Sequence, residues 1–364
     1  MILFIILSFP VLVMLCVSLY NLITDPTFRS NRYTLKSSPL VSVLIPARNE
    51  EENIEKCLLS VLKQTYTNIE IYVLNDSSTD NTAFIVQELK KKYSQINLIE
   101  GKPVKEGYNG KNWACAQLSK IAGGDLLLFI DSDVTIAPET IGLAVKYHEN
   151  DNVDVLSIFP TQRLSSIGEW LVVPLMNWIL LAFLPLKLIY SSKNQSLMAA
   201  NGQFFMWKKE VYTTVGGHTL AANELVEDMF LASKAKQNGF KVMTLLGGEL
   251  VFCRMYKTLQ QAVDGYSKNF YPGFKISALA FLLLILFLFS VNILPFYLIT
   301  VFDFYILPIA AILLTRVLIS LLSRQNLLVN LLLHPFQMLL MLYTGINSMF
   351  AYHSKKIIWK GRKV

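Results

Sequence analysis

A long apolar segment opens the chain: residues 2–22 contain no charged side chain. About 20 such residues span the hydrocarbon core of a bilayer as a helix. The positive-inside rule puts the N-terminus outside and the next domain in the cytoplasm, because cationic residues come only after the segment (Arg29, Arg32, Lys36). A cleaved signal peptide fits less well, since it would begin with a basic region. The sequence therefore predicts a transmembrane anchor at 1–23 and a juxtamembrane linker at 24–39.

The C-terminal third is also apolar, in keeping with a chain that is 53% hydrophobic. We expect a membrane region at 275–352, followed by a basic tail at 353–364. Within the membrane region, spans are predicted at 276–298, 304–322 and 327–352.

The number of predicted spans does not fix the side of the membrane on which the basic tail lies. With the N-terminus outside, four simple spans would leave the basic tail outside, against the positive-inside rule. The last span is the weakest because it contains His334, Pro335 and Gln337. A re-entrant or interfacial segment there would keep the tail cytoplasmic. Either way, we predict a multi-pass protein of the plasma membrane with its polar domain in the cytoplasm.

Residues 40–274 alternate between strand and helix patterns. Strands are expected at 40–45, 69–74, 96–99, 125–130 and 153–159. Asn49 is expected to begin the first helix with Glu52 as its capping-box partner, and a second helix is expected at 80–92. This βαβαβ order predicts an α/β domain with a Rossmann-like, mostly parallel sheet and helices on both faces.

The apolar stretch 167–190 interrupts this polar domain. It contains two prolines and also Glu169 and Lys187. A membrane span there would separate the two halves of the domain, so we favour a helix at the interface. A span is the alternative.

Carboxylates follow the strands at the edge where open α/β sheets bind ligands. Asp131 and Asp133 come directly after the apolar run 126–130, and Asp76 follows an earlier strand. Two carboxylates on one short turn form a hard oxygen site suited to Mg²⁺ or Mn²⁺. Asp76 is of the type that accepts a hydrogen bond from a base or ribose, although acidic residues there also cap turns.

The ordered set of these loops, with Glu227-Asp228 further on, resembles the family 2 glycosyltransferases over about residues 41–254. The resemblance implies a GT-A fold, a nucleotide-sugar donor (usually a UDP-sugar), a divalent cation and inversion at the anomeric carbon. It also implies that Asp131 and Asp133 hold the cation against the donor diphosphate. By the same resemblance, Pro46, Ala47, Glu50 and Asp76 contact the donor nucleotide, and Arg48 in the same loop is expected to contact the donor as well.

Lys111 follows Gly110 in the segment that precedes the strand expected at 125–130. A lysine in this position can approach a phosphate as a point charge. Trp113 could stack on a ring, but the alternative is a helix start with its aromatic side chain in the core.

The resemblance assigns a catalytic role to Asp228, which begins an amphipathic helix. In the family, the aspartate at this position is the general base that takes the proton of the acceptor hydroxyl. A hydroxyl is a poor nucleophile near neutral pH unless a base takes its proton. Glu227 is the less favoured candidate, and both could merely stabilise the helix N-terminus. Residues 200–203 and 216–218 match acceptor-side loops of the family.

Arg254, in Arg254-Met255-Tyr256, resembles a short form of the arginine motif that lies near the donor diphosphate. The Gln-x-x-Arg-Trp motif of processive polysaccharide synthases is missing, which disfavours a polymerase. Residues 266–269, just before the membrane region, could contact phosphate or lipid headgroups.

With its N-terminal anchor, its apolar C-terminal third and its final Trp359-Lys360-Gly361-Arg362, nearly the whole chain resembles the membrane glycosyltransferases of bacterial carotenoid and hopanoid pathways. This implies a membrane lipid acceptor, with a carotenoid or other terpenoid as the leading candidate. Polyprenyl phosphate or a glycerolipid is the enzymatic alternative, and a non-catalytic membrane scaffold is the non-enzymatic one. Nothing in the sequence indicates nucleic-acid binding, and it leaves the oligomeric state open.

Overall fold

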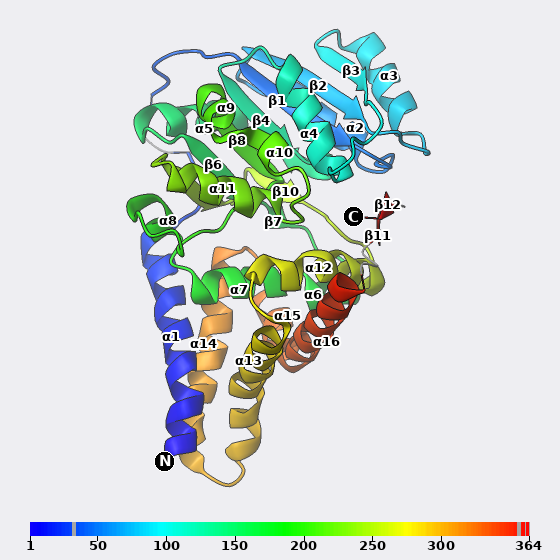
Figure 1. The fold of residues 1–364 in the computed structure, drawn as a ribbon. Helices are drawn as coiled ribbons and strands as arrows, with labels where there is room; N and C mark the ends of the chain where they lie inside the picture. The colour runs from blue at the N-terminus through cyan, green and yellow to red at the C-terminus, as the bar shows by residue number, and fades with distance from the viewer. Residues whose placement is uncertain (31–33, 355–357, 361, 364) are drawn as a thin grey trace.

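The computed structural model describes residues 1–30, 34–354, 358–360 and 362–363. Within them, seven strands form the central sheet of the polar domain, in the order β3-β2-β1-β4-β8-β6-β9 (Figure 1). Neighbouring strands are parallel except β8, which runs antiparallel to β4 and β6. The predicted mostly parallel sheet is confirmed. The strands are β1 Val41–Ala47, β2 Ile69–Asn75, β3 Ile96–Glu100, β4 Leu126–Ile130, β6 Val155–Phe159, β8 Phe204–Lys208 and β9 Val242–Leu246.

Helices cover both faces of this sheet. The alternation of side chains along β1 sends Val43 to one core and Leu44 to the other. The first core is closed by α2 Ile54–Leu62, α3 Thr82–Lys92 and α5 Thr140–Asn150. The second is closed by α4 Gly110–Ile121, α9 Lys209–Val215 and α11 Glu227–Gln237, and it continues into the apolar helices below the domain.

The first helix begins later than the sequence predicts. Strand β1 runs on through Ala47, and Asn49 adopts a left-handed conformation with φ 51°. Its side-chain oxygen accepts a hydrogen bond from the backbone N–H of Thr79 (2.8 Å), so it joins two loops rather than capping a helix. Helix α2 begins at Ile54, and Glu52 forms an ion pair with Lys257. The predicted capping box is therefore wrong, because a contact distant in sequence uses the asparagine.

Three helices in the described chain are long and apolar enough to cross a membrane: α1 Ile2–Thr24, α13 Ala278–Leu298 and the helical segment Asp303–Leu322, which contains α14 Ile306–Leu322. They lie side by side below the sheet (Figure 1). The N-terminus and the α13–α14 connection lie at the end far from the sheet. Large apolar side chains, among them Phe9 and Leu283, point outward from this group.

The third predicted C-terminal span, 327–352, is broken into α15 Leu327–Leu332 and α16 His334–His353. It is not among the helices apolar enough to cross a membrane in the described chain. Helix α16 packs along α12 Leu259–Phe274, near the polar domain. Buried Gln337 donates to the carbonyl of Trp170 and to Asn330, so polar contacts explain the polar residues of this segment. The re-entrant or interfacial alternative agrees with this arrangement.

The stretch 167–190 forms three short helices rather than the single helix predicted: α6 Ile167–Val172, α7 Pro174–Phe183 and α8 Lys187–Ser191. Pro174 begins α7, as proline does at the first position of a helix. Helix α7 lies across the upper ends of α1 and α14, whereas α6 packs against α12 and α16 (Figure 1). Asn21 of α1 donates to the carbonyls of Leu181 and Leu184, which fixes this placement.

Two smaller sheets complete the architecture. Strands β5 Val134–Ile136, β10 Val251–Cys253 and β7 Thr161–Gln162 form one of them beside the end of β4. Strands β11 Ile358–Trp359 and β12 Arg362–Lys363 form a hairpin in the basic tail. This hairpin contacts the polar domain through Lys360 and Arg362, so the tail and that domain lie on one side of the membrane helices.

Candidate active site

The two aspartates of the expected metal site lie in the turn between β4 and β5. Asp131 donates its backbone N–H to the carbonyl of Gln203 and accepts from the N–H of Val134, which makes the turn tight. Burial raises the pKa of Asp131 above its ordinary value. Burial, followed by the charges of Asp131 and Glu50, raises the pKa of Asp133 to about 7. The turn thus concentrates negative charge that a cation would offset.

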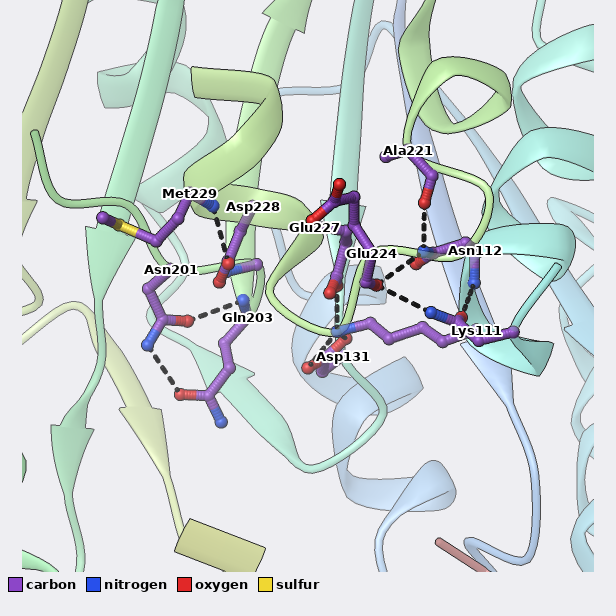
Figure 2. Close-up of polar contacts among 12 residues, drawn as sticks. Lys111, Asn112, Asp131, Asn201, Gln203, Ala221, Glu224, Glu227, Asp228 and Met229 are labelled. Carbon is purple, nitrogen blue, oxygen red and sulfur yellow. Dashed lines mark hydrogen bonds and ion pairs between the residues drawn. The ribbon is translucent and has the colours of Figure 1, made fainter. Parts of the chain in front are cut away.

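Lys111 joins this turn to α11. Its ammonium nitrogen lies 2.9 Å from Oδ1 of Asp131 and 3.2 Å from Oε1 of Glu227 (Figure 2). Burial acts to lower the pKa of Lys111, but the two carboxylates raise it well above its ordinary value. The lysine is therefore a fixed positive charge at the centre of the site.

Two asparagines hold the start of α4, and so Lys111, in place. Asn109 caps the helix by accepting from the N–H of Asn112 (2.8 Å). Asn112 in turn donates to the carbonyls of Ala221 (2.6 Å) and Glu224 (3.0 Å) (Figure 2). Trp113 is a packing residue here, since its indole donates to the carbonyl of Lys102 and its ring packs edge-on against Tyr108.

Asp228 lies at the first turn of α11. Its two carboxylate oxygens accept from backbone N–H groups, one from Gly202 (2.8 Å) and the other from Met229 (2.7 Å; Figure 2 shows the Met229 contact). Burial, followed by the charge of Glu227, raises the pKa of Asp228 to about 7. Each oxygen keeps a lone pair beyond these bonds. The group is thus suited to accept a proton near neutral pH.

Glu227, the other candidate base, has a different environment. Burial acts to raise its pKa, but Lys111 and Lys268 hold the pKa below its ordinary value. An acid of lowered pKa is a weaker proton acceptor. The environments of the two neighbours therefore favour Asp228 as the base and Glu227 as the partner of Lys111.

The first two strands bring the expected donor contacts to the same edge. Pro46 and Ala47 end β1, and the N–H of Asp76 donates to the carbonyl of Ala47 (2.8 Å). Arg48 holds the β2 loop by donating to the carbonyls of Asp76 and Ser77. Glu50 lies close enough to Asp133 to affect its pKa. The structure brings these residues and the aspartate turn together.

Arg254 comes directly after strand β10. Cys253, the last residue of β10, pairs with Val134, the first residue of the antiparallel strand β5, so Arg254 and Asp133 leave the ladder at the same end. The Arg254 side chain binds the buried carboxylate of Glu169 instead (2.8 Å), and Glu169 also caps α6. The role of Arg254 in donor binding stays a prediction.

In one of the two expected acceptor-side loops, 216–218, the residues serve packing inside the domain. His218 is buried and forms a hydrogen bond with the hydroxyl of Tyr212 (2.7 Å), and burial lowers its pKa to about 4. Gly217 has φ 48°, and a Cβ there would meet the Tyr212 ring at 2.3 Å. The missing side chain of Gly217 therefore permits this close contact with Tyr212. Gly202 of the other loop lies against the site, where a Cβ would be 3.4 Å from Lys111 Nζ and from Glu227 Oε1.

The residues present fit a divalent cation that is shared with a substrate. No group of three or more metal-binding side chains exists among the residues that the structure describes. However, Mg²⁺ is commonly held by one or two carboxylates together with substrate phosphates. Oδ1 of Asp133 is buried without a hydrogen-bond partner, which is costly unless a ligand satisfies it.

Sequence reasoning missed part of this site. Lys268 of α12 lies near enough to Glu227 to affect its pKa, whereas the sequence names it only within 266–269 as a possible contact of phosphate or lipid headgroups. Lys360 pairs with Glu50, and Arg362 pairs with Asp76 (2.6 Å). The sequence signals for the last two are the basic character of the tail and the segment Trp359-Lys360-Gly361-Arg362, which carries part of the resemblance to membrane glycosyltransferases but assigns neither residue to the site.

This combination of fold and site defines a class of enzyme. Residues 42–216 match the family model described as glycosyl transferase family 2. Residues 42–216 therefore form a domain that matches the family 2 glycosyltransferases, its sheet and helices have the GT-A arrangement, and the resemblance seen in the sequence is confirmed.

Similar proteins agree with this class. The chain is 28% identical over 236 residues to 4,4'-diaponeurosporenoate glycosyltransferase of Staphylococcus haemolyticus, covering 64% of this chain and 61% of the relative. For the Staphylococcus aureus (strain USA300) protein of the same name, the identity is 28% over 264 residues, covering 67% and 66%. The match thus spans less than two thirds of these relatives.

A solved structure shares the fold over nearly the whole chain. It is a mannosyltransferase from Pyrobaculum calidifontis in complex with GDP-Man and Mn²⁺. The alignment covers 95% of this chain and 98% of that chain, with a TM-score of 0.55 and 16% identity.

Proposed function

We propose that this protein is an inverting, metal-dependent glycosyltransferase that moves a sugar from a nucleotide-sugar donor to a membrane lipid acceptor. The observation that carries the proposal is the position of Asp228. Its buried carboxylate has a pKa raised to about 7, and it lies next to Glu227, which Lys111 connects to Asp131. A proton acceptor and a diphosphate-binding turn thus share one site.

The donor side of the proposal rests on the carboxyl edge of the sheet. Asp131 and Asp133 would hold Mg²⁺ or Mn²⁺, which when bound offsets the negative charge of a leaving diphosphate. Asp76 and the end of β1 would hold the nucleoside, with a UDP-sugar as the leading candidate. The mannosyltransferase of similar fold, solved with GDP-Man and Mn²⁺, supports a metal and a nucleotide-sugar but leaves the nucleoside to experiment.

A single displacement accounts for inversion. The acceptor oxygen forms a bond to the anomeric carbon while the bond from that carbon to the diphosphate oxygen breaks. The bonding electrons leave with the diphosphate, and an oxygen of Asp228 takes the acceptor proton as the new bond forms. The backbone N–H groups of Gly202 and Met229 hold the carboxylate in position for this transfer.

The acceptor is proposed from the apolar helices below the site. A lipid is too apolar to diffuse through water, and α1, α13 and α14, which are long and apolar enough to cross a membrane, lie next to the polar domain. The relatives named for 4,4'-diaponeurosporenoate support a carotenoid or other terpenoid. We place the protein in the plasma membrane with its glycosyltransferase domain in the cytoplasm.

An ionised carboxylate of the acceptor is the second candidate nucleophile, and the names of the relatives favour it. A carboxylic acid is already deprotonated at neutral pH, so it needs no base. The presence of Asp228 favours a hydroxyl. Polyprenyl phosphate and glycerolipids are the remaining acceptor classes.

The test uses detergent-purified protein, a panel of UDP-, GDP- and ADP-sugars, Mn²⁺ or Mg²⁺, and total membrane lipid extract, with products read by mass spectrometry. We expect a metal-dependent glycolipid that is missing with Asp131→Ala and with Asp228→Asn. A glycolipid that persists undiminished with Asp228→Asn would reject the base and favour the carboxylate acceptor. No product together with no metal-dependent nucleotide binding would favour the scaffold alternative.

A further inference from the structure

The basic tail reaches the donor side of the site. Arg362 donates through Nη1 to Oδ2 of Asp76 (2.6 Å), and Lys360 forms an ion pair with Glu50. The carbonyl of Lys360 accepts from Nε of Arg48 (3.2 Å). These contacts join residues about 300 positions apart in the chain. They place two cations at the edge where the nucleotide is proposed to bind.

The guanidinium of Arg362 also lies at the start of α4. A Cβ on Gly110 would be 3.0 Å from Nη1 of Arg362 and 3.1 Å from Oδ2 of Asp76. Glycine therefore leaves room for the arginine against the helix N-terminus. Backbone N–H groups at a helix N-terminus favour anions, so this is a position where a phosphate would be stabilised.

Two arginines near the site are held by partners that are not proposed to bind the donor. Arg48 donates to backbone carbonyls of the β2 loop, and Arg254 binds the carboxylate of Glu169. Arg362 differs, because its partner Asp76 is the proposed acceptor for the nucleoside. When a nucleoside takes Asp76, the guanidinium loses that carboxylate, and the diphosphate becomes the anion closest to it.

Lys360 lies close to the turn that contains Asp131 and Asp133. It is near enough to Asp133 to act on its pKa, and its partner Glu50 acts on the same group. A diphosphate bound against Asp131 and Asp133 would therefore come within the field of Lys360. Arginine suits the planar, two-pronged recognition of phosphate, and lysine suits a point contact.

We propose that Lys360 and Arg362 are donor-binding residues that contact the diphosphate of the nucleotide-sugar, and that Glu50 and Asp76 hold them at the site before the donor arrives. This inference rests on the proposed function and adds the tail to its donor site. Both cations come from the C-terminal hairpin, so donor affinity depends on a segment outside the matched family domain at 42–216.

The test is calorimetric binding of nucleoside diphosphates to the full-length protein in detergent with Mn²⁺. UDP, GDP and ADP are titrated first, and the one that the wild type binds most tightly is kept as the probe. We expect Lys360→Gln and Arg362→Gln each to weaken binding of that probe about tenfold, the usual loss for one charge-assisted hydrogen bond. Binding of the matching nucleoside without phosphate should not weaken, since Arg362→Gln frees Asp76.

Two further variants guard against misfolding and nonspecific charge effects. Gly110→Ala keeps every charge but displaces Arg362, and we expect it to weaken binding of the diphosphate probe as well. Arg324→Gln removes an exposed arginine that pairs with Glu249 away from the site, and it should bind the probe as the wild type does.

The outcomes separate this inference from the proposed function. Wild type that binds a nucleoside diphosphate, with equal or tighter binding in both tail variants, would overturn the tail inference alone. In that case the hairpin would be a plug or a structural element. Wild type that binds none of the three diphosphates with Mn²⁺ or Mg²⁺ would overturn both.

Discussion

The ammonium nitrogen of Lys111 lies 2.9 Å from Oδ1 of Asp131, so the start of α4 neutralises the first carboxylate of the proposed metal pair. The same nitrogen reaches Glu227, the neighbour of the proposed base. This one side chain connects the proposed donor half of the site to the proposed acceptor half.

Replacing Lys111 with methionine should disable the site and modestly destabilise the protein. Loss of the charge leaves Asp131 and Glu227 without their shared partner, and we expect transfer to fall about 100-fold or more. The pair is partly exposed, so the stability cost should be only about 1–2 kcal/mol. Steady-state transfer and thermal unfolding measure the two effects.

Lys120→Met on the same helix is the matched control, because Lys120 is exposed at the far end of α4. It should leave both transfer and stability unchanged. Equal losses in the two variants would mean that helix composition, rather than the ion pairs of Lys111, is responsible.

The pH dependence of transfer should report the protonation of Asp228. Its pKa is raised to about 7, and a general base works only when deprotonated. We therefore expect kcat/KM to rise about tenfold per pH unit below about pH 7 and to level off above it. Rates measured across this range with a hydroxyl acceptor test the assignment.

The Asp228→Asn variant should lose both the activity and this pH profile. Asp264→Asn changes an exposed aspartate of α12 and should keep both. A wild-type rate that is flat from pH 5 to pH 8 would exclude a base with a pKa near 7.

Asp133→Asn should abolish metal dependence without destabilising the metal-free protein. Oδ1 of Asp133 is buried and has no hydrogen-bond partner, so little is lost when the charge is removed. We expect Mn²⁺ to raise the melting temperature of the wild type and not that of the variant. Transfer should fall by at least tenfold.

The exposed substitution Glu106→Gln is the control for this experiment. It should respond to Mn²⁺ as the wild type does. An Asp133→Asn protein that Mn²⁺ still stabilises fully would place the cation elsewhere.

The tail and the loop between α13 and α14 should lie on opposite sides of the membrane. The tail hairpin contacts the glycosyltransferase domain, whereas the α13–α14 connection lies at the far end of the membrane helices (Figure 1). In a Cys16→Ser background, Val301→Cys should react with an impermeant maleimide on intact cells. Ser354→Cys should react only after lysis.

Reaction of the cysteine at position 354 on intact cells would contradict this topology and support a crossing by α16. Reaction of the two engineered cysteines under the same condition would likewise reject opposite sides. Both engineered proteins must transfer sugar normally for the labelling to be interpreted.

Local sequence patterns predicted the donor edge because its signals are short in range. The buried run of β4 followed by Asp131 and Asp133, and the carboxylates that begin α11, are contiguous patterns. They follow from the burial of apolar strands and from the placement of acids at helix N-termini. The predictions failed where a side chain contacts residues that are distant in sequence. Asn49 bonds the β2 loop instead of capping a helix, and Glu52 pairs with Lys257.

By itself, the sequence determined the class of fold, the long apolar helices α1, α13 and α14, and the position of the acidic turn. Periodicity and apolar content depend on residues that are close together in the sequence, so they can be recognised from a single sequence. Only the tertiary structure decided which charges meet. Lys111 pairs with Asp131 and Glu227, and Arg362 reaches Asp76 across 286 positions of the chain. Such pairs depend on how helices and loops pack around the sheet, and that packing brings together charges that are distant in sequence.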